Sequence, residues 1–503
     1  MGKKLSKKIK ILSILLAAIT VVGVVASILI ANNSFGRIIK KASKNLTSYA
    51  INATYDADNT LSAEQTIEYI NKTGDSLENI CLHLYPRAFR NGATILPYTS
   101  LNKASCFPNG TSYGDISVSK VDINGESANF EFVGEDSDIL RINLYKNLEN
   151  KAKITIDINF ELTIPNCTHR FGYYNGMVNL GNWYPIICVY KNGEWNTTPY
   201  YSTGDPFVSE CSNYSVNIKY PNDYSCYGTG EQSVNNNTST FKALAVRDVA
   251  LVLTNKSQCS QAQSGNTQVT YVGYAQDADI ENNAKISAQA VDYFSETFGR
   301  YPYSSLVVVK SAFLHGGMEY PNIVIVSDNI SETEEFNKVI VHEIAHQWWY
   351  GVVGSDQINS AWMDESLAEY STCLFFEQFD EYNIDYGEQI MDATASYLLY
   401  VDVISSLNGK VNTRMNCAVN EYGNEYEYTY MIYVKGVIMF DSLREAIGKN
   451  KFEKALNKYY KKYAFKIATE ENFIDCFNSV CNNNVTSFFS GWLEGTNVVG
   501  YID

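Results

Sequence analysis

The chain has 503 residues, of which 45% are hydrophobic and 19% charged, the balance of a globular protein with two or three domains. Its formal net charge is -16 at pH 7, so the bulk of the chain repels nucleic acid and anionic membrane surfaces, and we expect no nucleic-acid partner. The eleven cysteines contain no C-x-x-C pair, which argues against a cysteine zinc site and a thioredoxin-type motif.

The N-terminal segment is expected to attach the chain to a membrane. Residues 1–10 carry five lysines, and residues 11–31 contain no charged residue. As a helix this apolar run would extend about 31 Å, enough to cross the hydrocarbon core of a bilayer. A cleaved signal peptide is the alternative, but the run is longer than a usual signal core and has no clear small-x-small site.

These features predict a single-pass membrane protein whose N-terminus is cytoplasmic and whose residues after the tether, including the second of the domains described below, are extracytoplasmic. Residues 1–10 would be a cytoplasmic basic segment, residues 11–31 the transmembrane helix and residues 32–49 a tether. Basic residues also follow the apolar run, so the charge bias that supports this orientation is small.

Residues 50–262 are predicted to form a large antiparallel β domain. Every second residue from Ile154 to Ile164 is apolar, which is the period of a strand with one buried face. The same alternation occurs in residues 80–84 and 214–220. Asn-Gly pairs at 109–110, 124–125 and 192–193 add turn signals.

The period of the apolar residues changes near Asp277. From Ile280 to Phe298 the apolar residues fall on one helical stripe, and Gly299 follows as a C-terminal cap. Residues 306–309 and 323–326 are short apolar runs typical of buried strands, and helical patterns then dominate to the end of the chain. We therefore predict a multidomain β plus α/β protein, whose second domain covers residues 263–503.

This second domain contains the pattern H-E-x-x-H within Val341–Trp349. On a helix His342 and His346 point off one face and can take neighbouring corners of a zinc tetrahedron, with Glu343 beside them to act on a water molecule. The chain has only five histidines, so the pattern would arise by chance in roughly one such chain in a few hundred. The alternative is a helix with two solvated or capped histidines.

A catalytic zinc needs a third protein ligand and one open position for water. Glu365 is the candidate, because eighteen residues separate it from His346 and a second helix returning after a short loop would bring it alongside. Asp364 and Glu369 are nearby competitors. Spacing alone does not separate a ligand from a carboxylate on a solvated helix face.

A possible substrate-binding segment precedes this pattern. Gly316 and Gly317 stand before Met318 and an apolar strand, and they would let an extended substrate approach the backbone and pair with its edge. Glu319 could then bind a substrate cation such as a free α-amino group. An ordinary turn entering a strand is the alternative. His315 is expected to be structural, because three ligands are already supplied.

A tyrosine after the metal-binding pattern could stabilise an oxyanion. A phenol facing the metal can hydrogen-bond the oxygen that becomes negative when a carbonyl is attacked. The chain has 38 tyrosines, and Tyr426, Tyr428 and Tyr430 stand just before Tyr433. The sequence pattern alone therefore does not show which of these four tyrosines would face the metal.

Taken together, these motifs resemble the aminopeptidase N family (peptidase family M1) of gluzincin metallopeptidases, in the same order and from about residue 50 to the C-terminus. The family's H-E-x-x-H, eighteen residues and Glu is matched by the pattern ending at Glu365, and its Trp-x-x-Glu by Trp362. Its Gly-x-Met-Glu-Asn segment resembles residues 316–320, with Tyr320 in place of Asn. Its Tyr-x-Lys-Gly segment matches residues 433–436.

The resemblance implies a β domain followed by a thermolysin-like zincin domain with one zinc ion per chain. It implies that Tyr433 stabilises the tetrahedral intermediate and that Glu343 activates the water. The implied zinc ligands are His342, His346 and Glu365. The implied substrate-binding residues are Gly316, Gly317, Met318 and Glu319.

Three departures from the family pattern weaken the expectation of exopeptidase action. No Gln or Glu of the β domain aligns before Trp183, where family members often hold the substrate amine, and Tyr320 replaces an asparagine beside Glu319. The large helical C-terminal domain of many members is also missing from the match. A zinc endopeptidase, a hydrolase of non-peptide substrates and an inactive surface binding protein on a peptidase scaffold remain alternatives. The sequence does not predict an oligomeric state.

Overall fold

The computed structural model describes residues 38–56, 58–481, 484–497 and 499. The predicted membrane helix, residues 11–31, lies outside the described residues, as does the start of the tether. Residues 45–503 form one compact unit, and the fold below is that of this unit. Within the described ranges, one helix, α6 (Tyr386–Asn408), is long and apolar enough to cross a membrane, a property that core helices of soluble proteins share.

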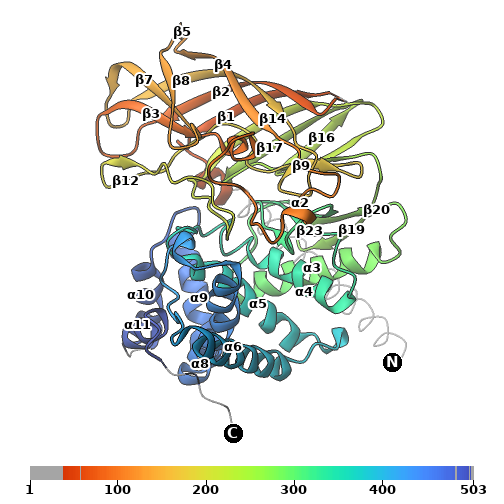
Figure 1. The fold of residues 1–503 in the computed structure, drawn as a ribbon, viewed down its shortest axis with the longest axis vertical. Coiled ribbons are helices and arrows are strands. Elements are labelled where there is room, and N and C mark those ends of the chain that lie inside the picture. The colour runs from red at the N-terminus through yellow and green to blue at the C-terminus, as the bar shows by residue number, and fades with distance from the viewer. Residues whose placement is uncertain (1–37, 57, 482–483, 498, 500–503) are drawn as a thin grey trace, which may run out of the picture. The chain divides into compact units, whose positions relative to one another are not determined.

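The first half of this unit is built from β-sheets (Figure 1). In β8 the predicted alternation is observed, because Ile154, Ile156 and Ile158 are buried and the residues between them are not. The largest sheet has the order β16-β17-β14-β1-β2-β8-β4-β5. Its strands are β1 (Ser48–Tyr55), β2 (Thr60–Ile70), β4 (Asp115–Ile123), β5 (Glu126–Ser127), β8 (Lys153–Thr163), β14 (Ser212–Lys219), β16 (Glu231–Asn235) and β17 (Thr238–Val246).

One strand pair of this sheet departs from the predicted antiparallel arrangement. Strands β1 and β14 run parallel, with Tyr49 opposite Tyr214, whereas the other pairs of the sheet are antiparallel. Neighbouring strands joined by a hairpin must be antiparallel, but β1 and β14 are distant in the sequence and are free of that constraint. The turns at Asn124-Gly125 and Asn192-Gly193 have positive φ at both residues, as their sequence predicts.

Smaller sheets complete the β-rich half. The first has the order β15-β18-β10-β9, the second β11-β3-β7-β6, and β12 pairs with β13. Their strands are β3 (Leu77–His83), β6 (Phe130–Val133), β7 (Ile139–Leu148), β9 (Phe171–Tyr174), β10 (Met177–Leu180), β11 (Ile186–Ile187), β12 (Tyr190–Lys191), β13 (Glu194–Trp195), β15 (Ser225–Gly228) and β18 (Leu251–Thr254). Short helical segments η1 (Tyr85–Phe89) and α2 (Lys103–Cys106) lie between them in the chain.

A five-stranded sheet begins the second half, in the order β19-β20-β21-β23-β22. Its strands are β19 (Ser257–Ser264), β20 (Thr267–Tyr274), β21 (Ser305–Ser311), β22 (Gly317–Met318) and β23 (Ile323–Ser327). The predicted boundary at residues 262 and 263 falls within β19. Strands β20, β21 and β23 are parallel, whereas β22 pairs antiparallel with β23 and forms the edge of the sheet.

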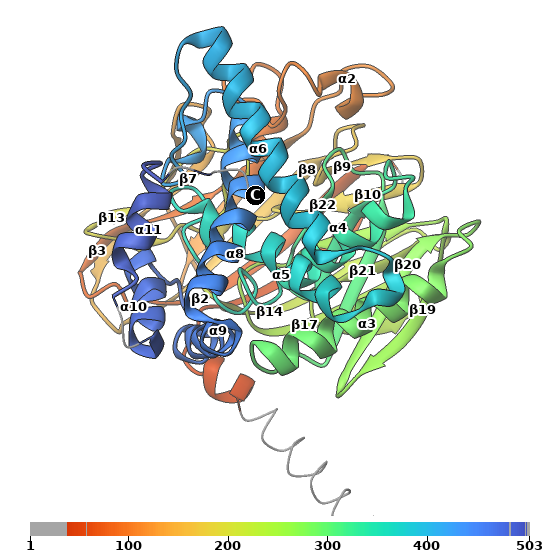
Figure 2. The same ribbon diagram turned by 90° about the horizontal axis from the view of Figure 1, so that it is seen from below.

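Helices make up the rest of the unit. Helix α3 packs on β19 and β20, and α4 packs against α3, α5, the edge strand β22 and its neighbour β23. Figure 2 shows α9, α10 and α11 lying together at one side of the helical part. The helices are α3 (Ile280–Thr297), α4 (Thr333–Ala345), α5 (Glu365–Gln378), α7 (Glu425–Thr429), α8 (Lys435–Ile447), α9 (Lys449–Tyr463), α10 (Glu470–Cys481) and α11 (Thr486–Leu493), with short segments η2 (Ala361–Met363), η3 (Asp380–Tyr382), η4 (Val419–Glu421) and η5 (Tyr430–Val434).

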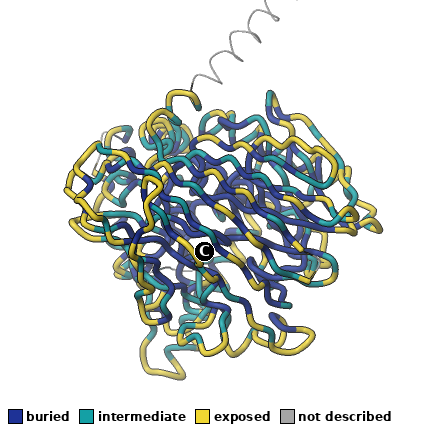
Figure 3. Tube along the Cα trace, turned by 90° about the horizontal axis from the view of Figure 1, so that it is seen from above, coloured by how far each residue is buried: buried dark blue, intermediate teal, exposed yellow. Residues whose placement is uncertain are grey.

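The coarse prediction of a β-rich N-terminal part followed by a helical C-terminal part is confirmed. Buried residues run through the interior of both halves, and exposed residues gather at the loops and outer faces (Figure 3). Buried hydrogen bonds join the two halves: Asn179 Nδ2 donates to the carbonyl of Ala312 at 3.0 Å, and the Ser311 hydroxyl donates to Asn179 Oδ1 at 2.7 Å. These bonds hold β21 and the residue that follows it against β10 of the β-rich half.

Candidate metal centre

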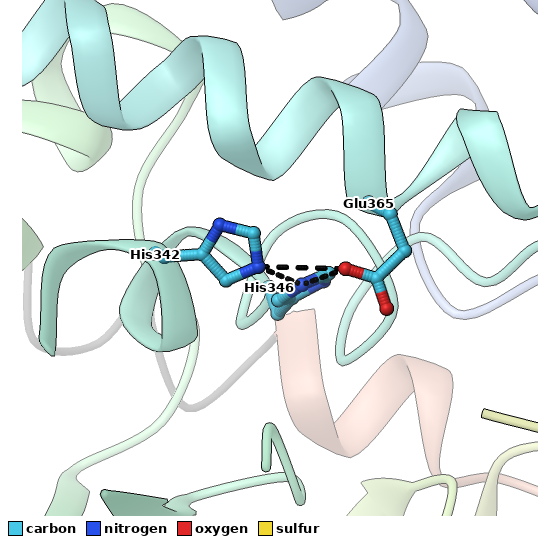
Figure 4. A group of neighbouring side chains, drawn as sticks. All are labelled: His342, His346 and Glu365. Atoms are coloured by element: carbon cyan, nitrogen blue, oxygen red, sulfur yellow. Dashed lines mark hydrogen bonds and ion pairs between the residues drawn. The ribbon is translucent and has the colours of Figure 1, made fainter. Parts of the chain in front are cut away.

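The two histidines of the H-E-x-x-H pattern lie at the C-terminal end of α4. Their Nε2 atoms are 3.0 Å apart, and Glu365 Oε2 lies 3.4 Å from His342 Nε2 and 3.2 Å from His346 Nε2. Figure 4 shows the three side chains pointing toward one another. Two imidazole nitrogens and one carboxylate oxygen that converge on one point are the donor set of a catalytic zinc site.

Glu365 reaches this point because it is the first residue of α5. The preceding Asp364 caps the helix by accepting a hydrogen bond from the Glu365 amide at 2.9 Å. Glu369 lies one turn later, and its Oε2 is 2.7 Å from Nδ1 of His342, on the far side of the ring. Of the three competing carboxylates, the structure therefore brings only Glu365 to both Nε2 atoms.

The opposite ring nitrogens of both histidines have acceptors nearby. His346 Nδ1 donates to the carbonyl oxygen of Trp349 at 3.0 Å, and His342 Nδ1 faces Glu369. Such partners fix the tautomer that leaves Nε2 free for a metal, and they fix the orientation of the ring. Both the identity of the three ligands and the acceptors behind the two imidazole rings therefore fit a zinc site.

The electrostatics show that the carboxylate and the two imidazoles favour a positive charge between them. Burial would raise the pKa of the Glu365 carboxyl, yet the two imidazoles hold it well below its usual range. Burial would lower the pKa of His346, yet the facing Glu365 carboxylate raises it to about 10. Each buried group therefore stabilises the charged form of its neighbour, and a bound divalent cation would replace the protons in that role.

Glu343 lies beside the metal ligands as a buried carboxylate. Burial raises the pKa of its carboxyl to about 7, which suits a group that takes up and returns a proton near neutral pH. Within the described residues, its Oε2 has no hydrogen-bond partner. A side chain at residue 317 would collide with the Glu343 carboxylate, so Gly317 provides the space that this carboxylate occupies.

Residues 316–319, which were predicted to bind the substrate, lie on and beside the edge strand β22. Gly317 and Met318 make up β22, which pairs with β23 on one side only, and the Gly316 carbonyl accepts a hydrogen bond from the Ser327 amide at 2.9 Å. The other edge of β22 is open to an extended backbone. Met318 is buried, and the Glu319 carboxylate at the end of the strand accepts a hydrogen bond from Gln357 Nε2 at 3.0 Å.

Tyr320, which replaces the asparagine of the family pattern, points away from this edge. Its hydroxyl donates to Asn182 Oδ1 at 2.6 Å, and its ring lies so close to Gly181 that a Cβ there would collide with it. The side chain therefore links the catalytic half to the β-rich half.

The ring of Tyr433 lies against one of the two metal-binding histidines. This tyrosine stands in η5, a π-helical turn between α7 and α8, and its ring stacks with that of His342 at 5.9 Å between centroids. Tyr430 instead stacks on Tyr400 at 4.3 Å, and Tyr426 is 64% exposed. The π-helical turn inserts an extra residue and so changes which side chains share a face, which the spacing in the sequence does not reveal.

Two residues of the β-rich half lie near the metal ligands and were not predicted from the sequence. Asp205, between β13 and β14, places a carboxylate oxygen within 4.8 Å of those of Glu319 and Glu365. Arg170 donates from Nη1 to Asp205 Oδ1 at 2.6 Å. Neither residue belongs to a recognisable motif, and Gly204-Asp205-Pro206 is an ordinary loop signal. His315 is not among the residues whose donor atoms converge in the described part of the chain.

A helix that presents two histidines and a buried base, together with a glutamate from the next helix, defines a metallopeptidase centre of the zincin type. Residues 280–492 match the model of the Peptidase family M1 domain, and the chain carries a domain of that family. The family predicted from the motifs is confirmed, and zinc is the metal that it implies.

Named relatives agree with this assignment. The chain is 24% identical over 243 residues to aminopeptidase M1-C of Oryza sativa subsp. japonica, which covers 46% of this chain and 27% of the relative. It is 24% identical over 408 residues to aminopeptidase N of Lactobacillus delbrueckii subsp. lactis, covering 75% of this chain and 46% of the relative. The chain thus spans less than half the length of these relatives.

The fold is also similar to that of a solved structure. The M1 zinc metallopeptidase from Deinococcus radiodurans superposes with a TM-score of 0.63 at 15% sequence identity, covering 90% of this chain and 93% of that chain. At this identity the likeness concerns the fold. It covers both the β-rich and the helical half.

Proposed function

We propose that the chain is a zinc-dependent aminopeptidase that removes N-terminal residues from peptides. The observation that supports this most is the convergence of His342, His346 and Glu365 beside the buried base Glu343, at the open edge of β22. Glu319 at the end of that edge would bind the N-terminus of the substrate and so limit how far the peptide extends past the metal. The names of the aminopeptidase relatives point to the same activity.

The chemistry divides among a few side chains. When bound by His342, His346 and Glu365, zinc would polarise the scissile carbonyl and lower the pKa of the attacking water. Glu343 accepts a proton from that water and returns it to the leaving amine. The Tyr433 hydroxyl donates a hydrogen bond to the oxygen of the attacked carbonyl as it becomes negative.

Substrate alignment would depend on the backbone. The open edge of β22 pairs with an extended peptide at Gly316, Gly317 and Met318, which fixes the scissile bond relative to Glu343. The absence of a side chain at Gly317 keeps the substrate strand and the catalytic base in close contact.

One experiment tests the activity. A peptide is incubated with the full chain in detergent, once with a free N-terminus and once acetylated, with and without a zinc chelator, and products are identified by mass. We expect chelator-sensitive loss of single residues from the N-terminus of the free peptide only. Internal cleavage of both peptides would replace the aminopeptidase assignment with that of a zinc endopeptidase. Absence of any cleavage by the zinc-loaded chain would refute both.

We also propose that residues 11–31 anchor the chain in a membrane, with residues 1–10 cytoplasmic and the domains 50–262 and 263–503 on the other side. The support is the uncharged run after five lysines. Protease added to intact cells should remove the domains and leave a short membrane-bound N-terminal fragment. Release into the medium of a chain that lacks its N-terminal segment would instead indicate a cleaved signal peptide.

A further inference from the structure

The segment that joins β22 to β23, residues 319–322, forms a buried turn beside the metal ligands. Asn322 has a positive φ of 61°, and the Ile323 amide donates to the Tyr320 carbonyl at 3.1 Å. One carboxylate oxygen of Glu319 lies within 4.8 Å of one of Glu365, whereas the side chain of Tyr320 is fully buried. Two neighbouring residues of one turn therefore carry a carboxylate of the site and a tyrosine shielded from solvent.

One side of this turn is held by the metal-binding helix. Gln347 directly follows the ligand His346, and its Nε2 donates to the carbonyls of Glu319 and Tyr320 at 3.3 and 3.1 Å. Its Oε1 accepts a hydrogen bond from the Asn322 amide at 2.9 Å. All three bonds reach backbone atoms of the turn, so they can form with any side chain at position 320.

The other side of the turn is held by the Tyr320 side chain. Its hydroxyl donates to Asn182 Oδ1 at 2.6 Å, and Asn182 Nδ2 donates to Asp248 Oδ2 at 2.8 Å. Asp248 Oδ1 in turn accepts hydrogen bonds from the Tyr184 hydroxyl at 2.8 Å and from the Val249 amide at 2.6 Å. These buried side chains form a continuous path of hydrogen bonds from the turn into the β-rich half.

The β-rich half is shaped to receive a tyrosine at this place. Asn182 takes a left-handed φ of 51°, and a Cβ added at Gly181 would collide with the Tyr320 hydroxyl. Asparagine at position 320, as in the family pattern, is a shorter side chain. It would leave the space beside Gly181 empty and deprive Asn182 Oδ1 of its donor.

We infer that Tyr320 is a positioning residue, which holds Glu319 in place for a substrate with a free N-terminus by tying the turn to Asn182 and Asp248. Glu319 and Tyr320 share one planar peptide unit, so a fixed Tyr320 side chain restricts the backbone that carries the Glu319 carboxylate. The inference deepens the proposed aminopeptidase function and rests on it.

The test compares Tyr320→Phe with the zinc-loaded wild-type chain on two substrates. One is a peptide with a free N-terminus, and the other is the same peptide with its α-amino group replaced by hydrogen. Phenylalanine fills the same space but cannot donate to Asn182. We expect KM for the free peptide to rise about 10-fold and kcat to change less than about 3-fold. Both constants for the slower desamino peptide should stay within about 2-fold, and zinc content should not change.

Tyr303→Phe is the matched control. The buried Tyr303 hydroxyl also donates from the catalytic half to the β-rich half, to the Ala245 carbonyl at 2.7 Å, but its residue does not belong to the turn. This variant should lower Tm about as much as Tyr320→Phe and leave the kinetics of both substrates unchanged. A loss of stability alone would therefore not imitate the expected result.

Tyr320→Asn, which restores the residue of the family pattern, is measured as well. It should raise KM for the free peptide at least as much as Tyr320→Phe, and wild-type kinetics of this variant would overturn the inference. Equal losses on both substrates in Tyr320→Phe, or no loss, would also overturn it and leave the proposed function intact. Cleavage of neither peptide by the wild-type chain would overturn the proposed function together with the inference.

Discussion

Arg247, in the β-rich half, donates from Nε to the carbonyl oxygen of Tyr350 at 2.7 Å, in the turn that follows the metal-binding helix. The same guanidinium donates to the carbonyls of Ser209 and Lys466, and within the described residues it makes no ion pair with a carboxylate. Tyr350 has a φ of 128°, which is unfavourable for a residue other than glycine. The neighbouring Trp349 carbonyl is the acceptor for His346, so Arg247 stabilises the turn that orients a metal ligand.

Replacing Arg247 by Met should therefore weaken both folding and metal binding. Several buried carbonyls would lose their donor, and we expect the free energy of unfolding to fall by about 3 kcal/mol. Urea unfolding and zinc titration measure the two effects. Arg414→Met, at an exposed position, is the control. Equal stability and zinc affinity of the two variants would contradict the role of Arg247.

Replacing Glu343 by Gln should leave zinc bound and lower kcat about 100- to 10,000-fold, because the amide cannot take up the proton of the attacking water. Peptide turnover and metal content are measured on the same preparation. Glu335→Gln, on the exposed part of the same helix, should keep full activity. Full activity of the Glu343 variant would exclude this carboxylate as the base.

Replacing His346 by Ala should abolish stoichiometric zinc binding, since two remaining ligands do not complete the site. Chelation of zinc from the wild-type chain should lower Tm, because the metal binds the folded state only and its removal leaves buried charges unbalanced. Atomic emission and thermal unfolding measure these effects. His315→Ala should keep its zinc, as this histidine lies outside the group of ligands. Zinc loss in that variant would call for a different ligand set.

Replacing Tyr433 by Phe should lower kcat about 100- to 1,000-fold with little change in KM, the pattern of a hydrogen bond formed only in the transition state. Steady-state kinetics on a free peptide measure both constants. Tyr426→Phe removes an exposed hydroxyl of the same segment and should have no effect. A variant that changes only KM would place the phenol in substrate binding instead.

Stability should depend on pH through Asp248. Burial raises the pKa of its carboxyl from 3.8 to about 7, despite hydrogen bonds from Tyr184 and the Val249 amide that favour the ionised form. Between these values the folded chain holds a proton that the unfolded chain has released. The free energy of unfolding therefore falls as pH rises from about 4 to 7, by at most about 4 kcal/mol from this group.

Asp248→Asn should lack this part of the pH dependence. Urea unfolding at pH 5 and pH 7.5 measures it as the difference between the two stabilities in wild type and variant. The amide carries a constant penalty from its altered hydrogen bonds, which cancels in that difference. Parallel pH profiles of the two proteins would show that Asp248 is already ionised at pH 5.

Local patterns predicted the elements of the site well. The alternation around Ile156, the helical stripe after Ile280 and the four-residue spacing of His342 and His346 are short-range signals, and each corresponds to an element in the structure. Only the folded structure selects Glu365 over its competitors Asp364 and Glu369, because the three carboxylates differ in the direction in which their side chains point. Spacing in the sequence does not carry that information.

Other features depend on contacts between distant segments. Asp205 lies in a loop of common composition, and only the packing of the β-rich half on the catalytic half places it beside Glu319. The parallel pairing of β1 with β14 likewise joins strands that no turn connects. Tyr433 could be selected by family resemblance but not by periodicity, because a π-helical turn interrupts the regular helical spacing just at that residue.

The same π-helical turn sets the direction in which the phenol of Tyr433 points around the helix axis. Lys435, directly after the turn, is fully buried and donates from Nζ to the carbonyls of Thr413 and Trp492, so the start of α8 is fixed. Each residue advances a helix by about 100°. Deleting Met431 would leave the letters Tyr-x-Lys-Gly intact and yet oblige the helix to lose its extra residue or rotate its preceding turn. A chain can thus contain the complete motif and still hold its tyrosine in an orientation that does not face the metal ligands.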